Sequence, residues 1–372
     1  MVNLRAMLLR VESAWSVHPL AFHLVSALRT VRSGDTLLVA FRWFVVVCQA
    51  ATLLITWPLW QVRSLPPMLP ALPLPYFDMG AVLLVSLALI LVRPKIGIVL
   101  HTALMAYAVL IDQTRLQPEI VSLIFLLWGT LPDPNLKTLA RAHLIALWCF
   151  AGLNKLLSPA FMNSGAQWML TGLIPTPPSW LRDNFGFVIV AAESGTGLLA
   201  IFPRTRKLAG LMALGLHLGI LLDLSPLGHN WNQSVWPWNA ALAFAGLALI
   251  APWHESLPRT LKDSRWFVRV LAIYLLVAPV GFYFGVTDAY LAHNLYSSNI
   301  PSASTSGSLN PGVTWTAFNV PLPPEHRLFE QFFYRSCHPG NSMVIYDSRW
   351  WFRIQGLAER HLTCPAEGAR AK

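Results

Sequence analysis

The chain has 372 residues, of which 55% are hydrophobic and only 12% are charged, and its mean hydropathy is +0.51. A soluble domain usually carries about 25% charged residues, so this composition excludes an ordinary soluble protein and predicts a polytopic membrane protein. The formal net charge of +10 would suit a nucleic-acid partner. In a membrane protein, however, excess lysine and arginine mark cytoplasmic loops, and we expect no nucleic-acid partner.

The first 35 residues are basic and lack the features of a cleavable signal peptide. Arg5, Arg10 and Glu12 interrupt the short apolar stretch, and no small-residue cleavage site follows it. We expect residues 1–35 to lie along the inner surface of the membrane, in part as an interfacial helix.

Residues 36–286 are predicted to form a bundle of about nine transmembrane helices, because a span needs about 20 apolar residues and fewer where its ends are anchored. The segments lie near 37–60, 79–93, 96–112, 118–133, 139–157, 186–203, 208–224, 235–252 and 266–286. The second, third and fourth are short or closely joined. Tilt or re-entrance would change the count by one.

The positive charges fall mainly in every second loop. With the N-terminus inside, the inner loops hold Arg5, Arg10, Arg29, Arg32, Arg93, Lys95, Lys137, Arg141, Arg204, Arg206, Lys207, Arg259, Lys262 and Arg265. The outer loops hold only Arg63, Arg115, Arg182 and, at a helix end, Lys155. This asymmetry predicts a multi-pass protein of the inner (cytoplasmic) membrane, with the lipid bilayer as its partner, the N-terminus inside and the C-terminal tail outside.

The tail, residues 287–372, changes character and predicts a small α+β extracytoplasmic cap. Residues 313–320, 342–347 and 349–354 are β-compatible, and residues 325–337 are helical in pattern. In an oxidising compartment Cys337 and Cys364 would be able to form a disulfide. The sequence does not show whether the two cysteines meet, so a disulfide and two free thiols both stay open.

Three ionisable residues are predicted at or near membrane depth, where such groups are costly and count as functional candidates. Lys155 follows the small residues Ala151 and Gly152, which would let another backbone or a ligand approach. Glu193 begins about 9 Å inside its predicted span, at 1.5 Å per residue, and His217 lies at nearly the same depth. The structural alternatives are a snorkelling lysine, a structural ion pair and a hydrogen-bonded histidine.

The stretch "HNWNQSVWPWN" at residues 229–239 has two interpretations. Its tryptophans suit the aromatic belt of a membrane interface. Alternatively Asn230, Asn232, Asn239 and His229 line the mouth of a cavity, with tryptophan faces flanking a ring-shaped ligand, which makes Asn230, Trp236 and Asn239 the candidate cofactor-binding residues. No metal-binding, phosphate-loop or nucleophile-elbow pattern is present, and we expect no metal site.

The segment "CFAGLNKLLSPAFMNSGAQWM" resembles the helix of vitamin K-dependent gamma-carboxylases that ends in their catalytic base, which places Lys155 at that position. Those enzymes have two adjacent lysines there, whereas this chain has Asn154 and Lys155. "ESGTGLLAIF" and "LHLGILL" are similar to later elements and place Glu193 and His217. The resemblance covers roughly residues 36–285 and extends to the bacterial proteins with a horizontally transferred transmembrane (HTTM) domain.

The resemblance implies a lyase with Lys155 as base at the outer face and with Glu193 and His217 as catalytic residues. Its cofactors would be reduced vitamin K or menaquinol with dioxygen and carbon dioxide, and its substrate a peptide or protein. Burial in apolar surroundings favours the neutral amine that a base must be. The alternative is a non-enzymatic membrane protein that binds lipid, quinone or peptide and assists export or maturation.

Overall fold

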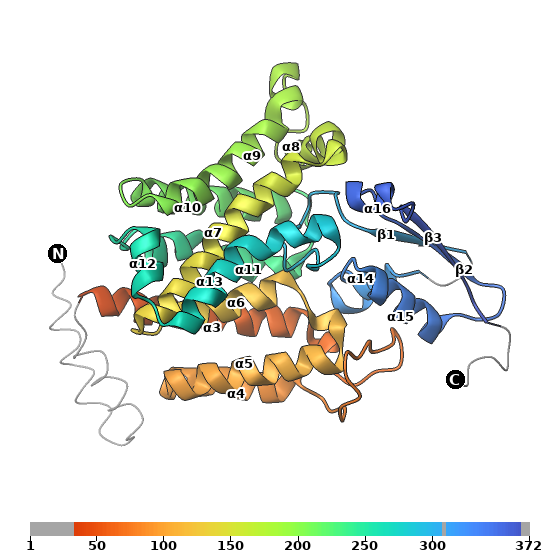
Figure 1. The fold of residues 1–372 in the computed structure, drawn as a ribbon, viewed down its shortest axis with the longest axis horizontal. Coiled ribbons are helices and arrows are strands. Elements are labelled where there is room, and N and C mark those ends of the chain that lie inside the picture. Colours follow the sequence, from red (N-terminus) through yellow and green to blue (C-terminus); the bar gives the residue numbers. More distant parts are fainter. Residues whose placement is uncertain (1–32, 307–309, 366–372) are drawn as a thin grey trace. The chain divides into compact units, whose positions relative to one another are not determined.

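The computed structural model describes residues 33–306 and 310–365 of the chain (Figure 1), so nearly all of the predicted interfacial segment lies outside the described residues. Two units are distinguished by their internal contacts, Met1–Ala40 and Phe41–Lys372. The bundle helices that follow Ala40 and the C-terminal cap both belong to the second unit, which contains all the sites discussed below.

Six helices in the described part of the chain are long and apolar enough to cross a membrane, so the nine predicted spans are not confirmed. They are α3 (Ser33–Ile55), α5 (Pro94–Ile111), α7 (Pro134–Leu156), α9 (Ser179–Ile201), α10 (Arg206–Leu224), and α13 (Trp266–Val277) continued by the 3₁₀ helix η6 (Ala278–Phe284).

The other predicted spans form shorter helices. The helix α4 (Gly80–Val92) has 13 residues and α6 (Pro118–Gly129) has 12, which gives about 20 Å against the roughly 30 Å of a bilayer core. The helix α11 (Trp236–Ala245) gains only the π-helical turn η5 (Gly246–Ile250). An apolar stretch shows that a segment avoids water, but it does not show that the helix extends far enough to cross.

The remaining helical segments are short. They are η1 (Trp57–Trp60), η2 (Gln113–Arg115), η3 (Phe161–Gly165), α8 (Ala166–Leu173), η4 (Gln233–Val235) and α12 (Leu257–Asp263). Proline opens α5, α6 and α7, where its missing N–H costs no hydrogen bond. At the start of α7 the Asp133 side chain also accepts from the backbone N–H of Asn135 at 2.8 Å.

The helix α7 lies at the centre of the bundle and packs against α6, α9 and α13 (Figure 1). Within its apolar window 56% of the residues are buried by protein, whereas in α13 the share is 22%. Much of α7 is therefore covered by other helices, whereas most of α13 has no protein cover.

Two glycines allow α7 and α9 to cross closely. A Cβ atom on Gly152 of α7 would lie 2.8 Å from the backbone nitrogen of Ser194 and 2.9 Å from the carbonyl oxygen of Val190. A Cβ atom on Gly197 of α9 would lie 2.7 Å from the backbone nitrogen of Cys149. Small residues at such a crossing let the two backbones touch, and the predicted close approach at Gly152 is what the structure has.

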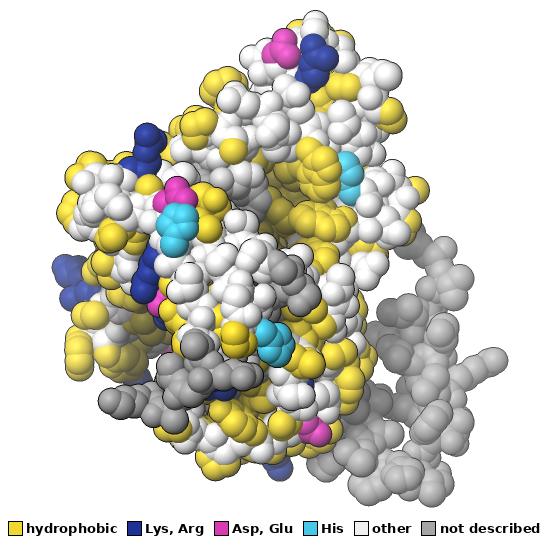
Figure 2. All heavy atoms as spheres, turned by 90° about the vertical axis from the view of Figure 1, so that its right-hand side faces the viewer, with side chains coloured by type: hydrophobic (Ala, Val, Ile, Leu, Met, Phe, Trp, Pro, Cys, Tyr) yellow, Lys and Arg dark blue, Asp and Glu magenta, His cyan; other side chains and the backbone are white. Residues whose placement is uncertain are grey.

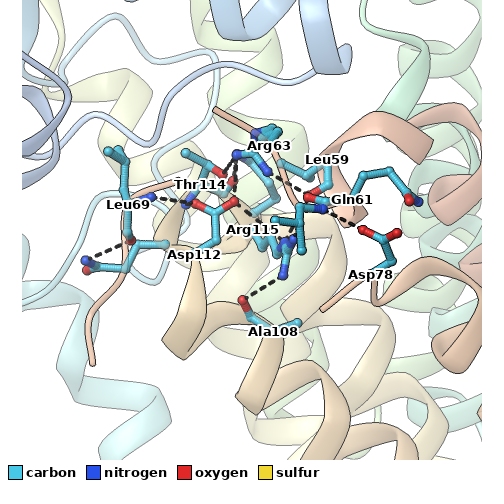
Figure 3. A network of polar contacts seen from close by, with 12 residues as sticks. Leu59, Gln61, Arg63, Leu69, Asp78, Ala108, Asp112, Thr114 and Arg115 are labelled. Carbon is cyan, nitrogen blue, oxygen red and sulfur yellow. Dashed lines mark hydrogen bonds and ion pairs between the residues drawn. The ribbon is translucent and has the colours of Figure 1, made fainter. Parts of the chain in front are cut away.

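A buried polar network joins the loop after α3 to the end of α5 (Figure 3). The Asp112 carboxylate accepts from the backbone N–H of Leu69 at 3.1 Å and pairs with Arg63 at 2.6 Å. Arg115, fully buried, donates to the carbonyl oxygens of Leu59 and Ala108. Every cation in this network has a carboxylate or carbonyl partner, so the network is structural.

The cap contains a three-stranded antiparallel sheet in the order β1 (Ser302–Thr305), β2 (Ser342–Tyr346) and β3 (Glu359–Thr363). The predicted strand at 342–347 and the predicted helix at 325–337 are confirmed as β2 and α15 (His326–Ser336). The predicted strands at 313–320 and 349–354 are wrong, because these runs form the short helices α14 (Val313–Phe318) and α16 (Trp350–Ile354). Runs rich in tryptophan and phenylalanine can pack as a helix or as a strand, so β-propensity alone does not decide which of the two forms.

The cap has its own hydrophobic core and a disulfide. Four apolar residues of α15 pack against β2, namely Leu328, Phe329, Phe332 and Phe333. Leu69, from the loop between α3 and α4, joins this core. Cys337 and Cys364 are bonded, with their Cα atoms 5.8 Å apart, which settles the alternative that the sequence left open.

Large apolar side chains remain exposed along the helices, among them Trp266 (76%), Val85 (70%) and Val47 (60%). Figure 2 shows many apolar and few charged side chains on the face that it views. A water-soluble protein rarely exposes so much contiguous apolar surface, and lipid is the environment that accommodates it.

We expect Gly152→Ala to weaken the fold, because its new methyl group would meet the backbone of α9. The free energy of unfolding in detergent micelles should fall by about 1–3 kcal/mol, the usual cost of overpacking. Gly215→Ala on α10 is the matched control, since no atom lies within 4 Å of the added methyl group. Equal stability of the two variants would contradict the close crossing.

Candidate functional site

Lys155, one turn after Gly152 on α7, is buried and paired with Glu193 of α9. Its Nζ atom donates to Oε1 of Glu193 at 2.9 Å and to Oε2 at 2.8 Å. The third N–H donates to the carbonyl oxygen of Leu295 at 3.3 Å. The side chains are only 4% and 7% exposed. The lysine therefore does not snorkel to water; it joins two helices and the loop that follows the last span.

The α7–α9 crossing brings this pair together. Glu193 directly precedes Ser194, whose hydroxyl donates to the carbonyl oxygen of Cys149 on α7 at 3.2 Å. This contact and the one at Gly152 fix the rotation of both helices. The two charged side chains, distant in sequence, are thereby placed on facing surfaces.

His217 on α10 is hydrogen-bonded through both ring nitrogens. The indole N–H of Trp148 donates to Nε2 at 3.0 Å, so Nε2 is an acceptor without a proton. The proton is then on Nδ1, which lies 2.8 Å from Oδ1 of Asn239. The Asn239 amide donates in turn to the carbonyl oxygen of Val235 at 3.0 Å. This series of hydrogen bonds holds His217 neutral in one tautomer and leaves neither ring nitrogen free.

A cavity of about 50 Å³ lies between these groups. Its walls come from α7, α9, α10 and α11, with Lys155, Glu193 and His217 among its lining residues. The remaining lining residues are Pro118, Leu147, Trp148, Ala151, Leu216, Ile220, Trp238, Asn239, His293, Leu295 and Tyr296. The lining is thus mostly apolar, with a few polar groups that converge, which is typical of a small-molecule site.

Trp238 is the one cavity-lining side chain in the described residues whose buried polar atom has no hydrogen-bond partner. Its indole Nε1 atom is fully buried, and the residue as a whole is 7% exposed. Buried N–H groups are nearly always hydrogen-bonded, and an orphan costs about 1–3 kcal/mol. Among the described residues the structure gives this indole N–H no hydrogen-bond acceptor, although its side chain forms part of the cavity wall.

The loop that follows α13 closes the cavity. His293, Tyr296 and Ser298 have positive φ angles of 58°, 56° and 55°, a region that side chains other than glycine seldom adopt. Asn232 donates to the hydroxyl oxygen of Tyr296, and Asn154 donates to the carbonyl oxygen of Ala292 at 2.9 Å. These bonds hold an unusual backbone in place, as at other functional sites.

Burial keeps His293 and Tyr296, two of the ionisable groups of this loop, neutral. Desolvation, with a smaller effect from the charge of nearby Glu119, raises the pKa of Tyr296 well above its ordinary value. Desolvation lowers the pKa of His293 to about 3. We call this loop, which includes His293 and Tyr296, the roof of the cavity. At neutral pH the roof therefore carries an uncharged phenol and an uncharged imidazole.

The structure gathers four of the six predicted site residues at this cavity: Lys155, Glu193, His217 and Asn239. The other two lie elsewhere. Asn230 is exposed, and the indole N–H of Trp236 donates to the carbonyl oxygen of Trp231 at 3.0 Å. The assignment of roles to these residues stays a prediction.

Sequence reasoning missed part of the lining. It left Trp148 unmarked within an apolar helix, and it assigned His293 and Tyr296 to the cap because a loop's folding back over a bundle has no local signature. Trp238 was considered as part of the aromatic belt or as a face beside a ring-shaped ligand, and not as a hydrogen-bond donor. An indole in an apolar run gives no sign of whether its N–H will find a partner.

An aromatic cluster lies outside the cavity beside Tyr296. His229 stacks on Trp168 with ring centroids 3.8 Å apart, and Trp231 contacts Trp168, Trp315 and Tyr296 at 5.1–5.5 Å. Part of the tryptophan-rich stretch thus forms a patch that joins α8 to the cap. In the described residues no group of three His, Cys, Asp or Glu side chains could hold a metal ion.

Residues 133–233, a little over a quarter of the chain, match the family described as Methylamine utilisation protein MauE. The match covers α7, α8, α9 and α10, which include three of the four helices that form the cavity walls. No curated protein and no solved structure is significantly similar to the chain. The match and the apolar helices identify the chain as an integral membrane protein.

This match corrects the resemblance drawn from the sequence. The segment around Lys155 lies within residues 133–233, which are similar to the methylamine utilisation family, whereas neither the vitamin K-dependent carboxylase family nor the HTTM family matches. Small residues followed by a lysine near a helix end arise wherever two helices cross closely at a buried ion pair, so the pattern is not specific to a carboxylase.

We expect single substitutions of the ion pair to be far more harmful than the double one. Glu193→Leu or Lys155→Met leaves one buried charge unpaired and should lower the free energy of unfolding by about 3–5 kcal/mol. The combined variant removes both charges and should recover most of that loss. Chemical unfolding of the purified protein in micelles measures all three.

The exposed pair Arg259–Asp263, with side chains 74% and 64% exposed, supplies the matched control. Arg259→Met with Asp263→Leu should change the free energy of unfolding by less than about 1 kcal/mol. A double variant of Lys155 and Glu193 that is no more stable than the singles would mean that the pair contributes through something other than mutual neutralisation.

Proposed function

We propose that the protein is a membrane-embedded binding protein for a compact, lipid-soluble molecule that carries a hydrogen-bond acceptor, and that quinones are the ligand class. The observation that carries the proposal is the orphan indole N–H of Trp238 in the wall of the cavity beside Lys155. A quinone carbonyl oxygen would accept a hydrogen bond from this N–H group, which has no protein partner among the described residues.

The size of the cavity supports a small ring. Each water needs roughly 10–15 Å³ of such space, so 50 Å³ would hold about four waters. At roughly 30 Å³ of liquid volume each, that is about the volume of one six-membered ring. A larger fused ring would need the roof loop to shift, whereas an unfolded peptide would not fit.

The position of the ion pair supports binding next to a carbonyl. Two of the Lys155 N–H groups are held by Glu193 at 2.8–2.9 Å, whereas the third makes only a long 3.3 Å bond to Leu295. This third donor can turn toward a ligand oxygen without breaking the ion pair. Lys155 would then hold one end of the ring and Trp238 another.

Binding fits the site better than acid–base catalysis does. Both ring nitrogens of His217 are engaged, and a general base needs a free lone pair within reach of its proton. The only carboxylate in the cavity wall is already neutralised by Lys155, so the cavity is not arranged for a methylammonium ion. If the chain takes part in the use of methylated amines, as the name of the matching family suggests, we propose that it does so as a membrane component and not as the amine-binding part.

We further propose that the chain lies in the inner membrane with the cap outside. The basic residues of the α4–α5 and α9–α10 turns, Arg93, Lys95, Arg204 and Lys207, support an inner location for those turns. The disulfide between Cys337 and Cys364 supports an oxidising compartment for the cap.

We expect Trp238→Phe to weaken quinone binding about tenfold, because it removes one N–H donor and keeps an aromatic ring; one hydrogen bond contributes about 1–1.5 kcal/mol. Isothermal titration of the protein in nanodiscs with a water-soluble benzoquinone, which has a single six-membered ring, measures the affinity. Trp266→Phe, on the exposed surface of α13, is the matched control and should bind as the unmodified protein does. Equal affinities of the two variants, or no binding at all, would overturn the proposal.

The orientation predicts which added cysteines are accessible from outside. In intact cells a membrane-impermeant maleimide should label Thr316→Cys, an exposed position of the cap, and should label Arg204→Cys in the α9–α10 turn only after permeabilisation. Unmodified protein treated in the same way gives the background from Cys48 and Cys149. Labelling of Arg204→Cys alone in intact cells would reverse the proposed orientation.

A further inference from the structure

A second concave site lies at the end of the bundle away from the cavity roof. It is a groove of about 400 Å³ between α3, the α4–α5 turn and the α6–α7 turn. Its lining residues are Arg42, Arg93, Pro94, Lys95, Ile96, Leu131 and Pro132. Three of the seven are cations and the other four are apolar, and the surface that lines the groove is almost entirely apolar, so the cations line it with their aliphatic stems while their charged ends contribute almost nothing to the wall. We call it the basic groove.

None of the three cationic side chains has a hydrogen bond or ion pair with any residue in the described ranges. Other arginines of the bundle differ in this respect. Arg206, for example, donates to the carbonyl oxygens of Ala200, Trp253 and Glu255. The basic groove therefore differs from the arginine sites that backbone carbonyl oxygens satisfy, because no described side chain or carbonyl group pairs with its cations.

The position of Arg42 makes this lack of a partner costly. Arg42 lies six residues after the start of the apolar window at Thr36, or about 9 Å along the helix at 1.5 Å per residue, and it is partly buried. A cation at such depth is stabilised by a partner or by reaching the interface. Reaching the interface brings Arg42 toward Arg93 and Lys95, whose like charges repel it. An external anion would relieve both effects.

The acidic residue nearest in sequence to the groove is already engaged. Asp133 follows Pro132, but its Oδ1 atom accepts from the backbone and side-chain nitrogens of Asn135 at 2.8 and 3.1 Å. It caps α7 and does not neutralise the basic groove.

The start of α5 adds further donors. The backbone N–H groups of Lys95 and Ile96 lie in its first turn, where they have no partner within the helix, and the helix dipole favours an anion there. This helix start by itself would be no evidence for a site. Its meaning here comes from the three unpaired cations around it.

The apolar wall decides between the possible anions. Ile96 is 63% exposed beside the cations, and Leu131 and Pro132 line the same groove. Free phosphate would use the cations and leave the apolar wall in water, whereas a phospholipid would place its headgroup on the cations and its acyl chains along the wall. Basic pockets between transmembrane helices bind anionic lipid headgroups in this way.

We propose that the basic groove binds the headgroup of an anionic phospholipid, with Arg42, Arg93 and Lys95 as its phosphate contacts. This site is independent of the proposed quinone site, which lies among other helices. In addition to the lipids that surround the helices as a solvent, one anionic lipid would then occupy a specific site on the protein.

The test uses the full chain in a neutral detergent, titrated with dioleoyl phosphatidylglycerol, dioleoyl phosphatidylcholine or inorganic phosphate. The rise in the midpoint of thermal unfolding with concentration gives an apparent affinity for each. We expect phosphatidylglycerol to stabilise the protein at concentrations at which phosphatidylcholine and phosphate do not. Arg93→Gln with Lys95→Gln should weaken its apparent affinity roughly thirtyfold, as expected for the loss of two interfacial cations.

Arg204→Gln with Lys207→Gln is the matched control, because it removes one exposed arginine and one exposed lysine from the α9–α10 turn. This variant should keep the affinity of the unmodified protein. An equal loss in both variants would mean that only net charge matters, and would overturn the site. Equal stabilisation by phosphatidylcholine would overturn the charge recognition, and equal stabilisation by phosphate would assign the groove to a free anion instead of a lipid.

Discussion

The ion pair between Lys155 and Glu193 is the interaction on which the arrangement of the membrane half depends. A charge buried at this depth is tolerated only with its partner, so α7 and α9 must keep one distance and one rotation. The glycine crossing at Gly152 and Gly197 makes that distance short enough. The bond from Lys155 to Leu295 extends the constraint to the loop that covers the cavity, so a single amine joins two helices and the roof.

The surroundings of the pair are the basis for proposing that the site binds a ligand. The hydrogen bonds that fix His217 to Trp148 and Asn239 use every polar atom of the imidazole ring. The roof residues His293 and Tyr296 are kept neutral by burial. What remains available is a donor on Trp238 and a weakly held donor on Lys155. Two donors and an apolar wall select for a molecule with acceptors, and they offer no group that would readily take up a proton.

The cations of the protein fall into two kinds. Arg115 and Arg206 are fully buried and are surrounded by backbone carbonyl oxygens, which compensate their charge within the protein. The side chains of Arg42, Arg93 and Lys95 have no such partners in the described part of the chain, and under the proposed orientation they lie at the end of the bundle where lipid headgroups are expected. Counting positive charges along the chain treats both kinds alike, although only the second kind is free to act on the membrane.

The sequence by itself determined the membrane class, the identity of most helices, the α+β nature of the tail and the polar residues that stand out in apolar runs. These depend on composition and local patterning, which a short window contains. It could not determine how many helices cross, because short helices such as α4 and α6 have the same composition as long ones. Nor could it separate the helical runs at 313–320 and 349–354 from strands.

Only the tertiary structure decided which polar residues meet. Lys155 and Glu193 are 38 residues apart, and His293 and Tyr296 come from a loop more than 130 residues beyond Lys155, so their contact depends on helix crossings that no local pattern encodes. The same crossings explain why the pattern around Lys155 resembled a catalytic helix: glycine and lysine at that spacing serve close packing and charge pairing equally well. The sequence shows which side chains are costly to bury. The partner that compensates each buried charge is determined by how the helices pack in the bundle.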